Sequence, residues 1–335
     1  MEYLTKKIFR KTQPITFRSI SSRHFELLGL ALIIALFVTV AATSAQTETY
    51  KFVSKWGNQG TGDGDFDHPY DIIIDNSEST LFISDTYNHR VQKFTTDGKF
   101  VSTWGTHGSG NGQLNFSMGL AIDNYDNVYV ADTCNNRIQK FTSDGRFLIA
   151  FGSRGSDEGQ FLWPYDVEVD EEGNIYVADA GNSRIQKFTN TGDLICTWGT
   201  HGSGEGQLKY PHGIDLDAQG NVYVGDYYNH RIVKFTSDGT FITQWGNGGT
   251  GNGQLSTTKG VFVDSEGNVY VADYWNCRIQ KFSANGGFIG TWGTKGTGDG
   301  QFNTPKGVVV DQDGYIYIAD TSNSRIQKFQ VNPAP

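Results

Sequence analysis

Three carboxylates and a histidine have the spacing of a possible cation site. Asp166 and Glu168 are two residues apart, so on a strand their side chains point to the same side. Asp215 follows Glu168 by 47 residues, and His212 follows Tyr165 by the same interval. Carboxylate oxygens favour calcium or a similar hard divalent cation. The candidate ligands are therefore Asp166, Glu168, His212 and Asp215; the alternative is a hydrated, acidic channel wall without a bound cation.

A second set of residues suits recognition of a ligand. One position that recurs every 47 or 48 residues changes its side chain each time, as Tyr70, Met118, Tyr165, His212, Lys259 and Lys306. Two residues earlier the chain has His68, Phe116, Trp163, Tyr210, Thr257 and Thr304, and later loops add Tyr87, Tyr228 and Trp275. Tyrosine and tryptophan offer large contact areas at small entropic cost. We expect one face with an aromatic side and a side carrying two lysines; the alternative is that these rings fill spaces between structural units.

The 47-residue interval belongs to a repeat that runs through most of the chain. An aromatic residue followed by glycine occurs at Trp56, Trp104, Phe151, Trp198, Trp245 and Trp292. An aspartate recurs every 47 residues at Asp85, Asp132, Asp179, Asp226, Asp273 and Asp320, and an arginine follows each one by five positions. A period of this length is typical of propeller blades. The expected units are residues 57–104, 105–151, 152–198, 199–245, 246–292 and 293–335.

Each unit contains the pattern of four short strands. In the second unit, the runs at 119–123, 127–131, 137–142 and 146–151 are separated by turn residues. The last unit ends before a fourth strand, whereas residues 52–56 match that missing strand and precede the first unit. We therefore predict an all-β, six-bladed β-propeller of four-stranded antiparallel blades, whose ring is closed by the N-terminal strand at about 50–56.

The repeated motif resembles a known family. Residues 211–214 (Pro-His-Gly-Ile), 220–226 (Gly-Asn-Val-Tyr-Val-Gly-Asp) and 229–232 (Asn-His-Arg-Ile) together resemble the NHL repeat, and six copies in register cover about residues 50–330. The resemblance implies a six-bladed propeller used mostly for binding, and some six-bladed relatives are lactonases or lyases. It also implies ubiquitin-ligase or RNA-binding roles. Those fit poorly, because the zinc domain of such ligases is not found in these residues and the propeller is acidic.

Features shared by all six units indicate scaffold, because a single site breaks the symmetry of a ring. Asp132 and Arg137 are most simply a structural ion pair with hydrogen bonds to loop backbone. The glycine-rich run 108–112 is a connection between blades rather than a phosphate loop, since no helix follows it. The acidic turns 170–173 and 311–314 lack the downstream glutamate of a calcium loop.

Residues 1–45 differ from the rest. Six basic residues precede an uncharged stretch at 27–45, which predicts a secretory signal peptide or an uncleaved transmembrane signal anchor. Either places the propeller, residues 46–335, outside the cytoplasm, in secreted, periplasmic or membrane-anchored form. Without the six basic and two acidic residues of this leader, the chain has 21 basic and 34 acidic residues. Such a charge disfavours nucleic acid and anionic lipid, so membrane contact is expected only through an uncleaved leader.

The sequence thus favours a monomeric, extracytoplasmic binding module for a protein, peptide or glycan over an enzyme. The face expected to bind consists of Tyr70, Phe116, Met118, Trp163, Tyr165, Tyr210, His212, Tyr228, Lys259, Trp275 and Lys306. The alternative is a metal-assisted, lactonase- or lyase-like enzyme with its cation in the channel. No cofactor other than calcium or another divalent cation is suggested.

Overall fold

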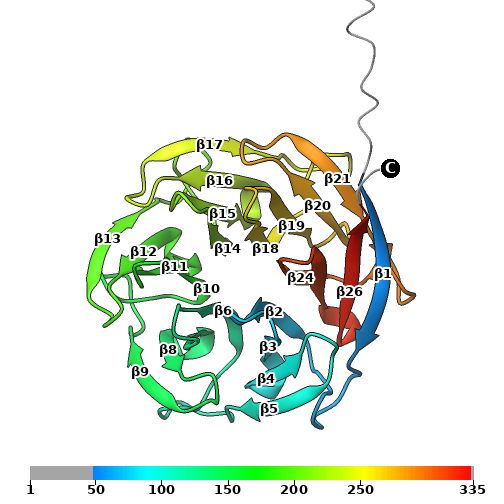
Figure 1. The fold of residues 1–335 in the computed structure, drawn as a ribbon. Helices are drawn as coiled ribbons and strands as arrows, with labels where there is room; N and C mark the ends of the chain where they lie inside the picture. The colour runs from blue at the N-terminus through cyan, green and yellow to red at the C-terminus, as the bar shows by residue number, and fades with distance from the viewer. Residues whose placement is uncertain (1–47, 333–335) are drawn as a thin grey trace, which may run out of the picture. The chain divides into compact units, whose positions relative to one another are not determined.

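The computed structural model describes residues 48–332, which form a six-bladed β-propeller (Figure 1). Each blade is an antiparallel sheet of four strands that runs from the channel to the circumference, as predicted. The first three blades are β2 (Pro69–Ile74), β3 (Thr80–Asp85), β4 (Arg90–Thr95) and β5 (Phe100–Trp104); β6 (Ser117–Ile122), β7 (Val128–Asp132), β8 (Arg137–Phe141) and β9 (Phe147–Phe151); and β10 (Pro164–Val169), β11 (Ile175–Asp179), β12 (Arg184–Phe188) and β13 (Leu194–Trp198).

The remaining three blades continue the ring. They are β14 (Pro211–Leu216), β15 (Val222–Asp226), β16 (Arg231–Phe235) and β17 (Phe241–Trp245); β18 (Thr258–Val263), β19 (Val269–Asp273), β20 (Arg278–Phe282) and β21 (Phe288–Trp292); and β24 (Pro305–Val310), β25 (Tyr315–Asp320), β26 (Arg325–Asn332) and β1 (Thr49–Trp56). Short 3-10 turns join second and third strands at η1 (Thr86–Asn88), η2 (Thr133–Asn135), η3 (Ala180–Asn182), η4 (Tyr227–Asn229) and η5 (Thr321–Asn323). The loop before β24 holds a short parallel pair, β22 (Thr294–Lys295) and β23 (Gln301–Phe302).

The N-terminal strand closes the ring, as predicted. β1 pairs antiparallel with β26, which makes it the outermost strand of the sixth blade (Figure 1). Tyr50 stacks on Trp292 of the fifth blade at a ring-centroid distance of 3.7 Å, and Lys55 forms a 2.6 Å ion pair with Asp299. β1 therefore covers the edge of β26 that would otherwise be exposed, and fastens the sixth blade to the fifth.

The recurring aspartate and arginine are scaffold, as predicted. Asp132 is fully buried, and its carboxylate accepts hydrogen bonds from Arg137 Nε at 2.7 Å and from the Asn115 backbone N–H at 2.7 Å. Arg137 in turn donates to the carbonyls of Gly110 and Gln113 in the loop between blades. The same ion pair occurs in all six blades at 2.7–2.8 Å. The repeat thus fixes each blade-to-blade connection through buried, charged hydrogen bonds.

The apolar core lies between neighbouring blades. Tyr129 and Ala131 of the second blade pack against Val167 and Val177 of the third. Near the channel the blades are so close that a Cβ on Gly213 would come within 2.2 Å of the Lys259 carbonyl oxygen, which leaves room only for glycine. Side chains of inner strands therefore meet those of neighbouring blades around a narrow hub.

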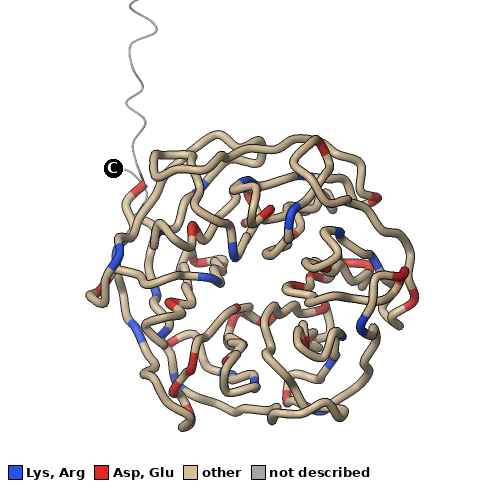
Figure 2. Tube along the Cα trace, turned by 180° about the vertical axis from the view of Figure 1, so that it is seen from behind, with Lys and Arg blue, Asp and Glu red and all other residues tan. Residues whose placement is uncertain are grey.

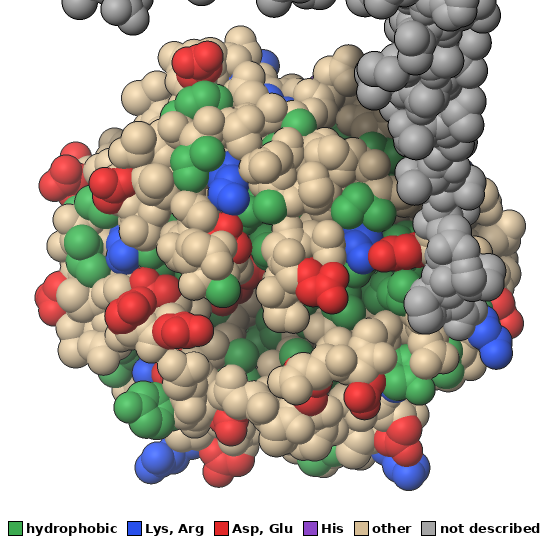
Figure 3. All heavy atoms as spheres, turned by 45° about the horizontal axis from the view of Figure 1, so that its top comes forward, with side chains coloured by type: hydrophobic (Ala, Val, Ile, Leu, Met, Phe, Trp, Pro, Cys, Tyr) green, Lys and Arg blue, Asp and Glu red, His purple; other side chains and the backbone are tan. Residues whose placement is uncertain are grey.

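The predicted leader, residues 1–45, lies outside the described residues. Between residues 48 and 332, the structure has no helix with the length and apolarity to span a bilayer. Lys and Arg positions are scattered around the ring rather than gathered on one side (Figure 2). The space-filling view shows acidic side chains spread over the visible face around its centre (Figure 3).

Candidate functional site at the channel mouth

His212 lies at the centre of a polar and aromatic cluster where the inner strands enter the channel. It is 1% exposed, and its Nδ1 lies 3.0 Å from Tyr70 Oη and 3.1 Å from Lys259 Nζ. Burial, together with the charges of Lys259 and Lys306, holds its pKa well below the usual range. The imidazole is therefore neutral, and the tyrosine hydroxyl and the lysine amine compete as donors for the single lone pair of its unprotonated Nδ1. Because Tyr70 belongs to the first blade and His212 to the fourth, this contact spans the hub.

A bulge in each inner strand brings these side chains to the mouth. In the fourth blade, Pro211 pairs with Asp226 but the next regular pair is Ile214 with Val224, so His212 lies in the interruption. Tyr70 and Lys259 lie in corresponding interruptions of β2 and β18. A bulge re-aims a side chain relative to a regular strand. The sites of variation and the sites of backbone irregularity therefore coincide.

Two lysines lie against the tyrosine rings of this cluster. Lys259 Nζ is 4.3 Å from the Tyr227 ring centroid and 5.4 Å from that of Tyr165, and Lys306 Nζ is 4.5 Å from the ring of Tyr70. Burial and the neighbouring charge of Lys306 hold the pKa of Lys259 well below its usual range, and burial lowers the pKa of Lys306 to about 7. The mouth is thus lined by amine and phenol groups, and burial disfavours the charged form of both amines.

Exposed rings continue outward from the mouth. Tyr210 lies 5.7 Å from Tyr165, 6.3 Å from Trp163 and 5.6 Å from Tyr228, measured between ring centroids. Trp163 is 43% exposed and Tyr228 is 53% exposed. Trp275, on the fifth blade, packs on Tyr274 at 4.6 Å. We call this set the aromatic face; its members are Tyr70, Trp163, Tyr165, Tyr210, Tyr227, Tyr228, Tyr274 and Trp275.

The residues predicted for the binding face do not all lie together in the structure. It brings Tyr70, Tyr165, His212, Lys259 and Lys306 together at the mouth, and joins Trp163, Tyr210 and Tyr228 to them through ring contacts. Phe116 lies instead in a separate cluster with Tyr87 and His89. Met118 is partly buried on β6. The expected separation of aromatic side and lysine side is wrong at the mouth, because the hub is narrow enough for Lys259 and Lys306 to lie over Tyr70.

Two residues of the mouth are missing from the sequence-based set. Tyr227 and Tyr274 follow the recurring aspartate, a position that is threonine in three other blades. There the threonine hydroxyl donates to a backbone carbonyl of the next blade, as Thr133 does to Pro164 at 2.7 Å. Tyrosine at this position in two neighbouring blades is a departure from the repeat. Comparing this position between the six units would therefore have identified Tyr227 and Tyr274 from the sequence.

The acidic residues predicted as metal ligands are used by the backbone. One Asp166 oxygen accepts the Val167 N–H and the other accepts the Ile214 N–H of the next blade, both at 3.0 Å. Asp215 likewise accepts from Leu216 at 2.7 Å and from Val263 of the next blade at 2.6 Å. These carboxylates therefore satisfy N–H groups at the channel edge of inner strands, which would otherwise lack partners.

Three of the four predicted metal ligands line one channel cavity, and His212 lies apart from them. Asp166, Glu168 and Asp215 line a cavity of about 160 Å³ together with Asp71, whereas His212 contacts Tyr70 and Lys259. In the part of the chain that the structure describes, no group of three or more His, Cys, Asp or Glu side chains is arranged to hold a metal ion. Burial raises the pKa of Asp215 to about 7 and that of Asp71 to about 6. The protonated, neutral forms of these two carboxyl groups are therefore more strongly favoured than they would be in water.

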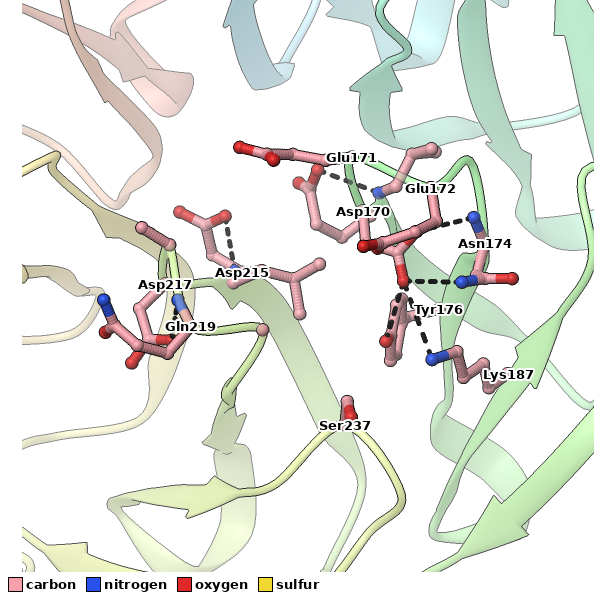
Figure 4. A pocket seen from close by; sticks show the side chains of 15 residues that line it. Asp170, Glu171, Glu172, Asn174, Tyr176, Lys187, Asp215, Asp217, Gln219 and Ser237 are labelled. Atoms are coloured by element: carbon pink, nitrogen blue, oxygen red, sulfur yellow. Dashed lines mark hydrogen bonds and ion pairs between the residues drawn. The ribbon is translucent and has the colours of Figure 1, made fainter.

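A larger acidic pocket, of about 570 Å³, lies between the turns that follow β10 and β14 (Figure 4). Asp170 on its wall is paired with Lys187 at 3.6 Å, and also accepts hydrogen bonds from Asn174 and Tyr176. Asp217 on the neighbouring blade is paired with Lys234 at 3.1 Å. These acids are therefore largely engaged in holding the first turn of each blade.

Family and structural comparisons agree with the architecture. The model of the NHL repeat matches residues 119–141, 161–188, 208–235, 259–282 and 302–329. Each matched segment covers strands of one blade, from the second to the sixth. The chain belongs to the NHL repeat family. No curated protein sequence matches this NHL-repeat chain significantly.

Solved structures with the same fold include enzymes. A streptogramin B lyase is 13% identical, with a TM-score of 0.61 over 87% of this chain and 100% of that chain. A gluconolactonase from Xanthomonas campestris is 14% identical, with a TM-score of 0.60 over 85% and 97%. A virginiamycin B lyase from Staphylococcus aureus is 16% identical, with a TM-score of 0.57 over 85% and 100%. At such identities the likeness extends to the fold alone.

Proposed function

We propose that this NHL propeller is an extracytoplasmic binding module that holds a glycan against its aromatic face. The observation that carries the proposal is the unbroken row of rings from exposed Trp163, through Tyr210 and Tyr165, to the buried His212. The location outside the cytoplasm rests on the predicted leader at 1–45.

The chemistry of the face favours a glycan among the ligand classes. Trp163, Tyr228 and Trp275 present flat rings whose edges carry an N–H or O–H group, which suits a ligand with apolar C–H faces and many hydroxyl groups. Large exposed aliphatic side chains lie elsewhere, on the outermost strands at Val53, Val101, Ile195 and Ile242. The face is therefore aromatic and polar rather than a continuous aliphatic patch of the kind that protein interfaces bury.

The test compares glycan binding by variants that all retain the scaffold. Trp163→Ala and Tyr210→Ala should each weaken binding of an array-identified glycan at least ten-fold, measured by calorimetry, because a central aromatic contact is worth about 2 kcal/mol. Tyr125→Ala is the matched control, since Tyr125 is 86% exposed in the turn between β6 and β7. Unchanged binding in the first two variants, or selective capture of peptides by the same residues, would overturn the assignment to glycans.

A metal-assisted lactonase- or lyase-like activity has less support. The structural neighbours with such names share the fold only, and both oxygens of Asp166 and of Asp215 already accept backbone N–H groups. His212, the fourth member of the predicted set, faces a lysine rather than an acid. Thermal unfolding with and without a chelator tests this alternative.

A further inference from the structure

Lys259 and Lys306 differ from several lysines of the third strands, which have an acidic partner. On the third strands, Lys140 pairs with Asp123 at 2.9 Å and Lys234 with Asp217 at 3.1 Å. Lys259 is only 9% exposed, yet none of the ion pairs within residues 48–332 involves it or Lys306. Charged groups are seldom buried without a partner of opposite charge.

The groups that surround the two amines replace that partner only in part. Both amines lie over the Tyr70 ring, with Nζ 5.9 Å from its centroid for Lys259 and 4.5 Å for Lys306. Lys259 also contacts His212 Nδ1 at 3.1 Å and lies 5.4 Å from the Tyr274 ring centroid. Ring faces and one neutral nitrogen attract a cation, but they supply no negative charge. An anion would complete the site.

We propose that Lys259 and Lys306 together bind a small oxyanion, a carboxylate or a phosphate, at the closed mouth of the channel. Resting on the proposed function, this makes the preferred glycan an acidic one, whose sugar rings pack on Trp163, Tyr210 and Tyr228 while its anionic group reaches the two amines. Tyr165 connects the exposed rings with the two amines. Its ring centroid lies 5.7 Å from that of Tyr210 and 5.4 Å from Lys259 Nζ.

The charge state of the amines supports the same site. Since burial brings the pKa of Lys306 to about 7, the free protein holds this amine partly neutral at neutral pH. An anion stabilises the protonated form and raises that pKa on binding. The groups that face the amines are neutral side chains from five different segments of the chain: Tyr70, Tyr165, His212, Tyr227 and Tyr274.

The experiment measures binding of three related sugars at constant ionic strength and pH 6.5. The probes are glucuronate, glucose 6-phosphate and glucose, with acetate and inorganic phosphate as sugar-free anions. Glucuronate or glucose 6-phosphate should bind at least ten-fold more tightly than glucose, and the preferred one identifies the group as carboxylate or phosphate. Lys306→Met should abolish this preference, Lys306→Arg should retain most of it, and Lys99→Met, at an exposed turn, should leave it unchanged.

The outcomes separate this inference from the proposed function. Equal binding of glucose and both anionic sugars, unaltered in Lys306→Met, overturns the anion site and leaves the glycan proposal standing. Binding of acetate or phosphate alone, lost in Lys306→Met, confirms the anion site and overturns the glycan assignment. If no anion binds to the wild-type protein, or if Lys306→Met with an intact near-ultraviolet spectrum binds anions normally, the inference is wrong.

Discussion

Tyr70 and His212, on opposite blades of the ring, are joined by a hydrogen bond of 3.0 Å between Oη and Nδ1. Their sequence separation is 142 residues, and the two inner strands that carry them do not pair with each other. The contact spans the hub, and it places a neutral imidazole beside Lys259. Its energetic contribution can be measured directly.

Removing the Tyr70 hydroxyl should destabilise the protein modestly. Tyr70→Phe keeps the ring but leaves the Lys259 amine as the remaining partner of His212 Nδ1. We expect a loss of about 0.5–1.5 kcal/mol in unfolding free energy, as for a typical hydrogen bond. In a His212→Phe background the same change should cost nearly nothing, and denaturant unfolding of the four proteins gives the coupling energy. Strict additivity of the two changes would contradict the contact.

Removing one buried clamp should cost much more. Asp132→Ala leaves the Arg137 guanidinium and the Asn115 N–H without their acceptor, so we expect a loss of about 3–5 kcal/mol. Asp63→Ala, at an exposed loop position, should change stability by less than about 0.5 kcal/mol. Urea unfolding followed by tryptophan fluorescence compares the two. Similar values for both variants would show that the clamp is dispensable.

Deleting the N-terminal strand should open the ring. A chain that starts at Gly57 loses the partner of β26 and the stacking of Tyr50 on Trp292, so one sheet edge and an aromatic surface become exposed. We expect a lower melting temperature and concentration-dependent association in light scattering. A chain that starts at Thr47 is the control. A monomeric Gly57 variant that melts like this control would show that closure by β1 is unimportant.

The Lys306 amine should make stability depend on pH. The folded-state pKa of about 7 lies below the ordinary value of 10.5, so between these pH values the unfolded chain binds the extra proton. Stability relative to Lys306→Met should therefore be lowest below pH 7 and rise as the pH increases from 7 to 10.5. Unfolding free energies at half-unit pH steps measure the difference. A difference that stays constant from pH 7 to 10.5 would place the lysine in contact with water or an acid.

Removal of divalent cations should leave the melting temperature unchanged. The oxygens of Asp166 and Asp215 are occupied by backbone donors, and the raised pKa of Asp215, about 7, disfavours the charged form that a cation requires. Thermal unfolding with chelator, and then with excess calcium, is the measurement. Stabilisation by calcium that disappears in Asp215→Asn would restore the metal site and the enzymatic alternative.

The sequence predicted the architecture because every unit repeats the same buried residues. Asp132 and Arg137 recur with constant spacing, and their shared role follows from that recurrence alone. The departures from the repeat identified Tyr165, His212 and Lys259 as unusual. Which of these residues meet depends on the width of the hub and on the bulges of the inner strands, and neither has a marker in local sequence.

The surroundings of Asp166 and Glu168 were likewise not predictable from the sequence. Alternation along a strand correctly places Asp166 and Glu168 on one side, but it does not reveal what they face. The offset between neighbouring blades brings the Ile214 N–H to Asp166. That offset is a property of the packed ring. The carboxylate that suggested a cation site in the sequence of one strand therefore accepts a backbone hydrogen bond from the next blade in the assembled propeller.

Construction of the sixth blade from both ends of the chain has a consequence for biosynthesis. A ribosome delivers about 5 to 20 residues per second, so β1 emerges on the order of ten seconds or more before Arg325–Asn332 is made. During that wait its partner does not exist, and Phe52 and Trp56 have no sixth blade to join. Closure of the ring is thus a late docking event that joins β1 to a strand made long after it.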